Sequence, residues 1–230
     1  MRLAVGTKIR NYTLDERIGH GASGEVWKAN DGSKTVAMKF MNQQLVNSEA
    51  AAQYRDHLDL EIRALGRLSH PHIPALYDHD LTFERPYLVM QYIEGQPYDR
   101  LIAGGEIFGL DLQKRLTVLD SIAGAVGAAH AAGIIHRDIK PAHISGIDEP
   151  FLLDFSVALE RDQTAQARPN VGTVLYMPPP QEPPDELSDH YSFALTAYEM
   201  IFGRHALFTI DDTGLTQITG FPVLGSPVLV

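Results

Sequence analysis

Two aspartates, each close behind a short apolar run, are the side chains best suited to chemistry in this sequence. Asp138 follows Ile134-Ile135, and Asp154 follows Phe151-Leu152-Leu153. An apolar run ahead of an acid predicts a buried strand that leaves the carboxylate at its end, facing a cleft. Two carboxylates placed in this way suit a metal-assisted transfer, in which one acts on a hydroxyl group and the other binds a divalent cation. Lys140 would add a positive charge beside the same reacting atoms.

Three glycines near the N-terminus have a spacing that suits phosphate binding. Gly19, Gly21 and Gly24 could form a turn that lies close over phosphates and offers them its backbone N–H groups. Dinucleotide-binding turns have the same spacing, but those turns open a helix. Here Val26-Trp27-Lys28 continues as a strand. We therefore predict that residues 12–40 form β-hairpins and that the glycines lie in one of their turns.

A helix predicted over residues 48–68 carries an acid on its apolar face. Leu58, Glu61, Leu65 and Leu68 recur with the 3-4-3 spacing of one helix face. A carboxylate on an inward face is unfavourable unless it is paired. Lys39, in the predicted strand 35–40, is the natural partner. The alternative is that Glu61 lies on the surface.

The C-terminal part of the chain is predicted to be mainly helical. A long Ala-rich helix over residues 112–132 ends before Gly133 and leads to Ile134. A second helix is predicted over residues 188–202. The first helix is expected to bury one apolar stripe, made of Leu112, Leu116, Leu119, Ile122, Ala123 and Val126.

Several motifs resemble those of eukaryotic-type Ser/Thr protein kinases. Residues 136–141, His-Arg-Asp-Ile-Lys-Pro, resemble their catalytic loop, and Asp154-Phe155-Ser156 resembles their metal-binding Asp-Phe-Gly. The motifs follow the family's order from about residue 12 to residue 208. The resemblance implies an α+β, bilobal kinase-like fold. We expect a β-rich N-lobe with one helix over residues 1–93 and a mainly α-helical C-lobe over residues 94–230 that lacks the family's late helices.

The resemblance also implies a function, which is ATP-dependent phosphoryl transfer to Ser/Thr hydroxyls of protein substrates. Asp138 would orient and deprotonate the hydroxyl, Lys140 would stabilise the transferring phosphoryl group, and Thr173 would bridge the two. Lys39, held by Glu61, would bind phosphates, and Asp154 would bind Mg²⁺. The implied ATP-binding residues are Gly19, Gly21, Gly24, Val26, Ala37, Lys39, Met90, Gln91, Ile93 and Ser145.

The sequence departs from the family at several of these positions. His143 stands where kinases have the Asn that binds a second metal ion, and imidazole suits softer ions than Mg²⁺. Ser156 replaces the last Gly of Asp-Phe-Gly, Ser145 replaces an apolar residue beneath the adenine, and residues 178–180 read Pro-Pro-Pro instead of Ala-Pro-Glu. We therefore expect weak activity with a relative preference for Mn²⁺. The alternative is a pseudokinase that acts as a nucleotide-binding or scaffolding module.

Composition and charge limit the partners and the location. A net charge of −10 argues against nucleic-acid binding, which needs a basic face. The chain has no cysteine, and no apolar run approaches the roughly 20 residues of a membrane span. We expect a cytoplasmic protein that does not bind membranes. The apolar tail, residues 216–230, is expected to cover the surface that the late helices would have buried, or to pair with another chain as a homo-oligomer or with a partner.

Overall fold

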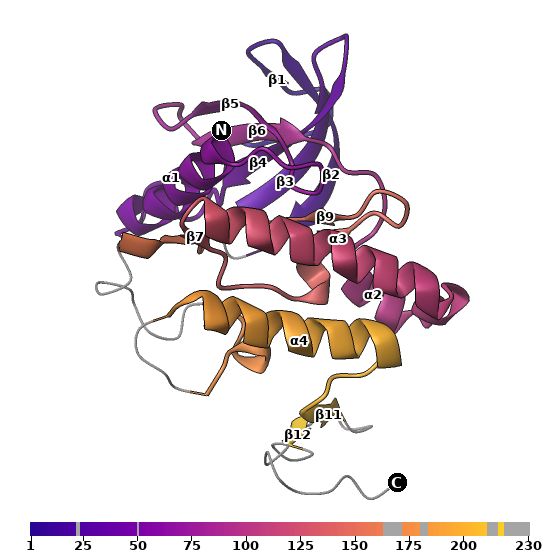
Figure 1. Ribbon diagram of the computed structural model, residues 1–230. Helices are drawn as coiled ribbons and strands as arrows, with labels where there is room; N and C mark the ends of the chain where they lie inside the picture. The colour runs from indigo at the N-terminus through magenta and orange to yellow at the C-terminus, as the bar shows by residue number, and fades with distance from the viewer. Residues whose placement is uncertain (22–23, 50, 163–171, 180–183, 211–215, 219–230) are drawn as a thin grey trace, which may run out of the picture.

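The computed structural model describes the chain except for residues 22–23, 50, 163–171, 180–183, 211–215 and 219–230. Its N-terminal part is a six-stranded antiparallel sheet in the order β1-β2-β3-β4-β6-β5 (Figure 1). The β-hairpins predicted over residues 12–40 are confirmed. The strands are β1 Lys8–Ile9, β2 Tyr12–His20, β3 Gly24–Asn30, β4 Thr35–Met41, β5 Leu76–Asp80 and β6 Tyr87–Gln91.

Strand β4 is covered on both faces, and its side chains alternate between two environments. Met38 and Phe40 are fully buried with Trp27 in an apolar cluster on the outer face of the sheet. Ala37 and Lys39 point to the opposite face, where they line a cleft. The alternation in this strand therefore places a lysine in the cleft while its neighbours build the core.

Helix α1, Ala51–Arg67, packs on the cleft side of the sheet through Leu58 and Ile62, which contact Leu88 of β6. The helix predicted over residues 48–68 is confirmed, with its described start three residues later. Glu61 lies on the same buried face and is 1% exposed. This burial contradicts the alternative of a surface Glu61.

The C-terminal part is built around two long helices, α3 Leu112–Ala131 and α4 Glu186–Phe202 (Figure 1). Asp111 caps α3 by accepting a hydrogen bond from the backbone N–H of Lys114, and Asp185 and Ser188 form a capping box at the start of α4. The smaller elements here are α2 Tyr98–Ala103, η1 Glu106–Gly109, β7 Ile134–Ile135, η2 Pro141–His143, β8 Ile144–Ser145, β9 Phe151–Leu152, β10 Leu159–Glu160, η4 Val174–Tyr176, β11 Phe208–Ile210 and β12 Thr216–Ile218.

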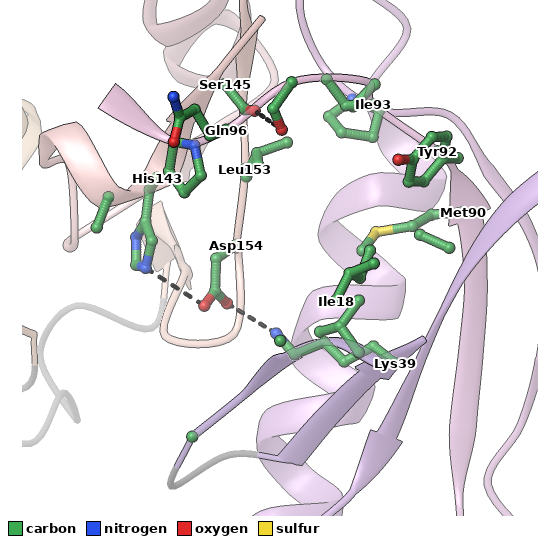
Figure 2. Close-up of a pocket in the computed structure, with 18 of the residues that line it drawn as sticks. Ile18, Lys39, Met90, Tyr92, Ile93, Gln96, His143, Ser145, Leu153 and Asp154 are labelled. Carbon is green, nitrogen blue, oxygen red and sulfur yellow. Dashed lines mark hydrogen bonds and ion pairs between the residues drawn. The ribbon is translucent and has the colours of Figure 1, made fainter. Parts of the chain in front are cut away.

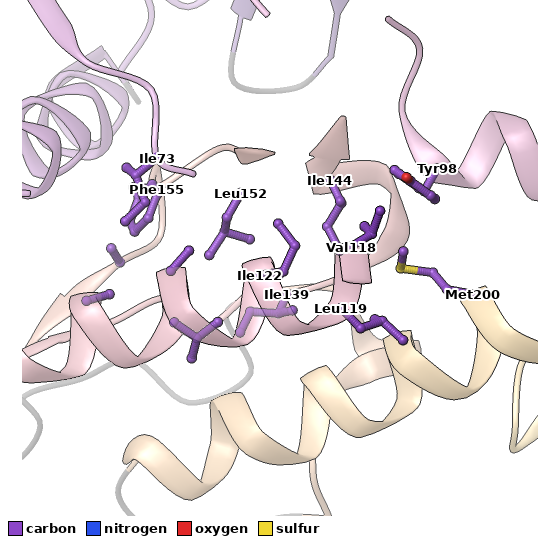
Figure 3. Close-up of a cluster of buried hydrophobic side chains, with 14 of the residues drawn as sticks. Ile73, Tyr98, Val118, Leu119, Ile122, Ile139, Ile144, Leu152, Phe155 and Met200 are labelled. Atoms are coloured by element: carbon purple, nitrogen blue, oxygen red, sulfur yellow. The ribbon is translucent and has the colours of Figure 1, made fainter. Parts of the chain in front are cut away.

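The predicted apolar stripe of α3 is partly wrong. Leu112 and Leu116 are 51% and 42% exposed, and Ala123 is also exposed. The helix is rotated so that other side chains face the core in Figure 3. The buried side chains of α3 are Val118, Leu119, Ile122, Ala125, Val126, Ala129 and His130.

Within the described residues, no helix follows α4. The last described element is the hairpin of β11 and β12. Residues 219–230, most of the apolar tail, lie outside the described residues, so its expected role stays a prediction. None of the helices in the described part of the chain is long and apolar enough to cross a membrane.

Candidate active site

The catalytic-loop motif is held in place by a buried acid from α4. The two oxygens of Asp189 accept hydrogen bonds from the backbone N–H groups of His136 and Arg137, both at 2.7 Å. His130 Nε2 lies 2.8 Å from one of these oxygens. Asp189 is 0% exposed, so these three contacts satisfy a carboxylate that water cannot reach. Asp189 therefore fixes the backbone of the two residues that precede Asp138.

Asp138 is engaged through both of its carboxylate oxygens. Oδ1 accepts a hydrogen bond from the backbone N–H of Thr173 at 2.8 Å, and Oδ2 accepts one from Lys140 Nζ at 2.8 Å. Lys140 also donates to the Thr173 hydroxyl, so the predicted bridge between these three residues is present. Although burial opposes it, the neighbouring His143, Lys140 and Thr173 lower the pKa of Asp138 below its ordinary value. Asp138 is therefore an ionised carboxylate at neutral pH.

Lys39 is shared between two acids from different parts of the chain. Its Nζ lies 2.7 Å from Glu61 Oε2 and 2.9 Å from Asp154 Oδ1 (Figure 2 shows the contact with Asp154). The predicted Lys39–Glu61 pair is confirmed. Burial disfavours the charged ammonium, but the two acids outweigh it and raise the pKa of Lys39. Lys39 likewise holds the pKa of Asp154 well below its usual range, although burial opposes this.

Burial acts differently on the second acid of this group. It raises the pKa of Glu61 to about 7, and the one ammonium of Lys39 offsets this only in part. The difference arises because Lys39 divides its charge between the two acids, while Asp154 also accepts a hydrogen bond from the backbone N–H of Ser156. Asp154 is also held in the left-handed backbone region, at φ 64°. The group carries its negative charge chiefly on Asp154.

His143 lies between the two aspartates. Its Nδ1 is 2.8 Å from the backbone carbonyl oxygen of Asp138 and 3.4 Å from the carboxylate Oδ2 of the same residue. Its Nε2 is 3.5 Å from Asp154 Oδ2 (Figure 2). A carbonyl oxygen can only accept, so Nδ1 carries the proton in the neutral ring and Nε2 has a free lone pair facing Asp154. Burial lowers the pKa of His143, which favours this neutral form.

A cleft of about 1060 Å³ lies between the sheet and the helical part. It is large enough to accept a nucleotide triphosphate. Asp154 and His143 are among the residues that line it (Figure 2). The structure brings every predicted ATP-binding residue to its walls, namely Gly19, Gly21, Gly24, Val26, Ala37, Lys39, Met90, Gln91, Ile93 and Ser145. The cleft lining does not include Asp138, Lys140 or Thr173. His143 lines the cleft and contacts Asp138.

The sequence prediction missed some of the cleft's apolar walls. Ile18 and Leu153 line it together with Tyr92. Ile18 stands next to Gly19, and Leu153 next to Asp154. Because the neighbours of a predicted phosphate turn and a predicted metal ligand lie near the same ligand, this adjacency was a usable signal.

Ser145 is buried and has a hydrogen-bond partner. Its hydroxyl donates to the carbonyl oxygen of Gly95 at 3.3 Å, between the strand β8 and the segment that follows β6 (Figure 2). A hydroxyl paired with the protein in this way presents less polarity to a ligand than a free one. Ser145 stands where the family has an apolar residue beneath the adenine, and the weak activity expected from this replacement stays a prediction. Thr164, a candidate phosphorylation site in the segment after Asp154, lies outside the described residues.

A bilobal fold with a glycine turn, a buried lysine–acid group and two linked aspartates defines the class of nucleotide-binding phosphotransferases. Comparison with known families is more specific. Residues 12–221 match the family model of the protein kinase domain. The chain therefore belongs to the protein kinase domain family, and its resemblance to the eukaryotic-type Ser/Thr kinases is confirmed.

Two of the curated relatives come from bacteria. The chain is 32% identical to serine/threonine-protein kinase PknH of Mycobacterium bovis, over 86% of this chain and 34% of the relative. It is 32% identical to serine/threonine-protein kinase Pkn1 of Myxococcus xanthus, over 92% of this chain and 31% of the relative. The chain thus spans about a third of the length of these relatives.

Solved structures agree with this assignment. A crystal structure of the Mycobacterium tuberculosis PknI kinase domain superposes with a TM-score of 0.66 and 25% identity, covering 89% of this chain and 77% of that one. The likeness extends over both the sheet and the helical part, which confirms the predicted kinase-like fold.

Proposed function

We propose that this chain transfers the terminal phosphoryl group of ATP to Ser or Thr hydroxyls of protein substrates, at a low rate. The observation that carries this proposal is the arrangement of Lys39, Asp154 and Asp138. Lys39 of the sheet lies 2.9 Å from Asp154 of the helical part, across the cleft. The imidazole ring of His143 contacts both Asp154 and Asp138, and so links the two aspartates. The relatives named serine/threonine-protein kinases support the choice of acceptor.

Asp138 orients the acceptor hydroxyl. As an ionised carboxylate it can accept the hydroxyl's hydrogen bond and hold the oxygen toward the phosphate. Lys140, which already contacts Oδ2 of Asp138, is placed to offset negative charge on the transferring group. Thr173 holds both, which keeps the carboxylate oriented before a substrate binds.

The cleft residues fit a nucleotide triphosphate bound with a divalent cation. Gly21 has no atom within 4 Å of the position a Cβ would take, so a phosphate can lie close to the backbone there. Lys39 supplies a positive charge that the nucleotide's phosphates can share with Asp154. When bound, the cation would supply charge neutralisation at the phosphates. Among the described residues no three His, Asp or Glu side chains are grouped to hold a metal alone, so the phosphates must provide further ligands.

His143 is the reason to expect a low rate and a preference for Mn²⁺. The lone pair on Nε2 and the Oδ2 oxygen of Asp154 face each other, and this pair of nitrogen and oxygen donors suits Mn²⁺ better than Mg²⁺. The His143→Asn variant should raise Mg²⁺-supported transfer by about tenfold and reduce the Mn²⁺/Mg²⁺ rate ratio. Mn²⁺ binding to the ATP-loaded protein, followed by electron paramagnetic resonance, should weaken in the same variant. An unchanged rate ratio together with unchanged Mn²⁺ binding would refute this role.

The function is tested by transfer of labelled phosphate from ATP. The wild-type chain and Asp138→Asn are incubated with a Ser- and Thr-containing protein mixture and Mg²⁺ or Mn²⁺, and acid hydrolysis identifies the labelled residue. We expect phosphoserine or phosphothreonine with the wild type and at least a hundredfold less with the variant. Equal labelling would refute catalysis by this site. ATP binding without transfer would instead indicate a pseudokinase.

The expected partner surface also remains a proposal. Among the described residues, Phe108, Leu112 and Phe202 are more than half exposed and belong to the same helical part of the chain. Exposed apolar side chains of this kind favour contact with another segment or chain. Light scattering at several protein concentrations tests this expectation, and a monomer at all of them would contradict homo-oligomer formation.

A further inference from the structure

A buried arginine that the proposed function does not use lies on the outer face of the sheet. Arg85, in the connection between β5 and β6, is 1% exposed. Its Nε donates to the backbone carbonyl oxygen of Met41 at 2.6 Å, and its Nη2 donates to Glu25 Oε1 at 2.6 Å. Its guanidinium carbon also lies 5.9 Å from the centre of the Phe40 ring. Arg85 therefore links three neighbouring parts of the sheet.

The two hydrogen-bonding partners of Arg85 stand at the root of the glycine turn. Glu25 directly follows Gly24 at the start of β3, and Met41, at the end of β4, is the register partner of Gly24. Val26, the next residue, lines the cleft. Because side chains alternate along a strand, Glu25 points to the face opposite Val26. Arg85 thus binds β3 on the outer face of the sheet, at the position where the opposite face of the same strand lines the nucleotide cleft.

Several contacts fix the carboxylate that Arg85 holds. Glu25 Oε2 accepts a hydrogen bond from Trp27 Nε1 at 3.3 Å, and Arg17 of β2 lies 3.9 Å from the same oxygen. Burial opposes ionisation of Glu25, but Arg85 outweighs it and lowers the pKa of this acid. Through Glu25, the strands on both sides of the glycine turn are joined to Arg85.

A buried guanidinium is an unfavourable way to fill space, because an apolar side chain would cover Phe40 without being desolvated as an ion. What an apolar residue could not do is bind a carbonyl oxygen and a carboxylate at once in a fixed planar geometry. This contrast favours a role in positioning over a role in core packing.

We propose that Arg85 is a positioning residue for nucleotide binding, which acts through Glu25 to hold the glycine turn in the conformation that accepts the phosphates of ATP. The proposal rests on ATP being the ligand of this cleft. It does not require the chain to transfer phosphate, since binding alone depends on the shape of the turn. The role concerns the free protein, because residues that are held in place before the ligand arrives lose less entropy when it binds.

The test is a double-mutant cycle on ATP affinity. Arg85→Met, Glu25→Gln and the double variant are compared with the wild type by isothermal titration calorimetry with ATP. We expect each single variant to raise the Kd for ATP about tenfold, equal to about 1.4 kcal/mol, and the double variant to add little to either. Arg10→Met is the matched control, because Arg10 holds the start of the same connection through Asp80 and, among the described contacts, does not reach Glu25.

A second readout separates positioning from general destabilisation. Hydrogen exchange of the backbone amides between residues 17 and 26 should accelerate in Arg85→Met and Glu25→Gln, but not in Arg10→Met. Additive effects on Kd, or a lowered melting temperature with the same Kd and the same exchange, would overturn the proposal. A wild type that binds ATP without transferring phosphate would refute only the proposed function, and this cycle could still be read. A wild type that binds no ATP would overturn both.

Discussion

Removing the shared lysine should destabilise the protein by an amount that grows with pH. Lys39→Met keeps most of the side-chain length but removes the charge between Glu61 and Asp154. Lys39 and Glu61 are 5% and 1% exposed, so water cannot replace the lost ammonium. Breaking a buried ion pair by removing one partner costs about 3 kcal/mol or more of unfolding free energy. A further cost then depends on how Glu61 titrates.

The sign of the pH effect follows from the raised pKa of Glu61. This pKa is about 7 in the folded protein against an ordinary 4.5, so the stability that Glu61 contributes is present at low pH and is lost as pH rises through 7. In the wild type the loss stops above pH 7, because Glu61 has ionised beside Lys39. In Lys39→Met, Glu61 stays protonated and each further pH unit costs about 1.4 kcal/mol. The difference between variant and wild type should therefore grow by about 2 kcal/mol between pH 7 and 8.5.

Urea unfolding of both proteins at pH 6, 7, 8 and 8.5 measures this difference directly. The control is the double variant Lys39→Met with Glu61→Gln, because a neutral amide needs no cation. It should show no additional slope above pH 7. If the wild-type and Lys39→Met stability curves ran parallel from pH 6 to 8.5, the shared-ammonium account of this group would be refuted.

Two further substitutions test the backbone around the site, each with a matched control. Gly24→Ala should weaken ATP binding at least about tenfold and cost about 2 kcal/mol of stability, because the new Cβ would clash with the backbone carbonyl oxygen of Phe40, whereas the Cβ of Gly21→Ala meets no protein atom within 4 Å and should leave stability little changed; equal losses of stability in the two variants, by urea unfolding, would contradict this. Asp189→Asn should lower the melting temperature by about 5–10 °C, because an amide has one acceptor oxygen for two backbone N–H groups. Asp185→Asn, at an exposed cap, should leave it within about 2 °C, since Asn caps a helix nearly as well; equal shifts in scanning calorimetry would show that the buried brace carries no special stability.

The parts of the fold that local pattern determines could be predicted from the sequence. Apolar and polar residues alternate along the strands around Gly21 and Lys39, and this pattern can be recognised in a single sequence. The burial of Glu61 could be predicted because Glu61 lies on an apolar helix face. Its pairing with Lys39 then follows, because a buried acid needs a cation. The glycine turn and both aspartates were recognisable from their short motifs.

Contacts between distant segments were harder to predict. Arg85 and Glu25 are 60 residues apart, and nothing in the sequence around either one marks it as buried or paired. The prediction of the buried apolar stripe of α3 was partly wrong for a related reason. Leu112 and Leu116 share the helical period with the core residues, so only the positions of the neighbouring elements decide which apolar side chains are covered.

The hydrogen bonds between Asp189 and the catalytic loop have a consequence for folding during synthesis of the chain. The acid lies more than 50 residues after the loop it holds, at separations of 53 and 52 residues from His136 and Arg137. Until α4 has been synthesised and packed, nothing else described in the structure satisfies the same two N–H groups. A nascent chain therefore contains Asp138, Lys140 and Asp154 before the catalytic loop can adopt its folded conformation. Deletion of the chain from Glu186 onward would abolish the activity of the site, although Asp138, Lys140 and Asp154 would all still be present.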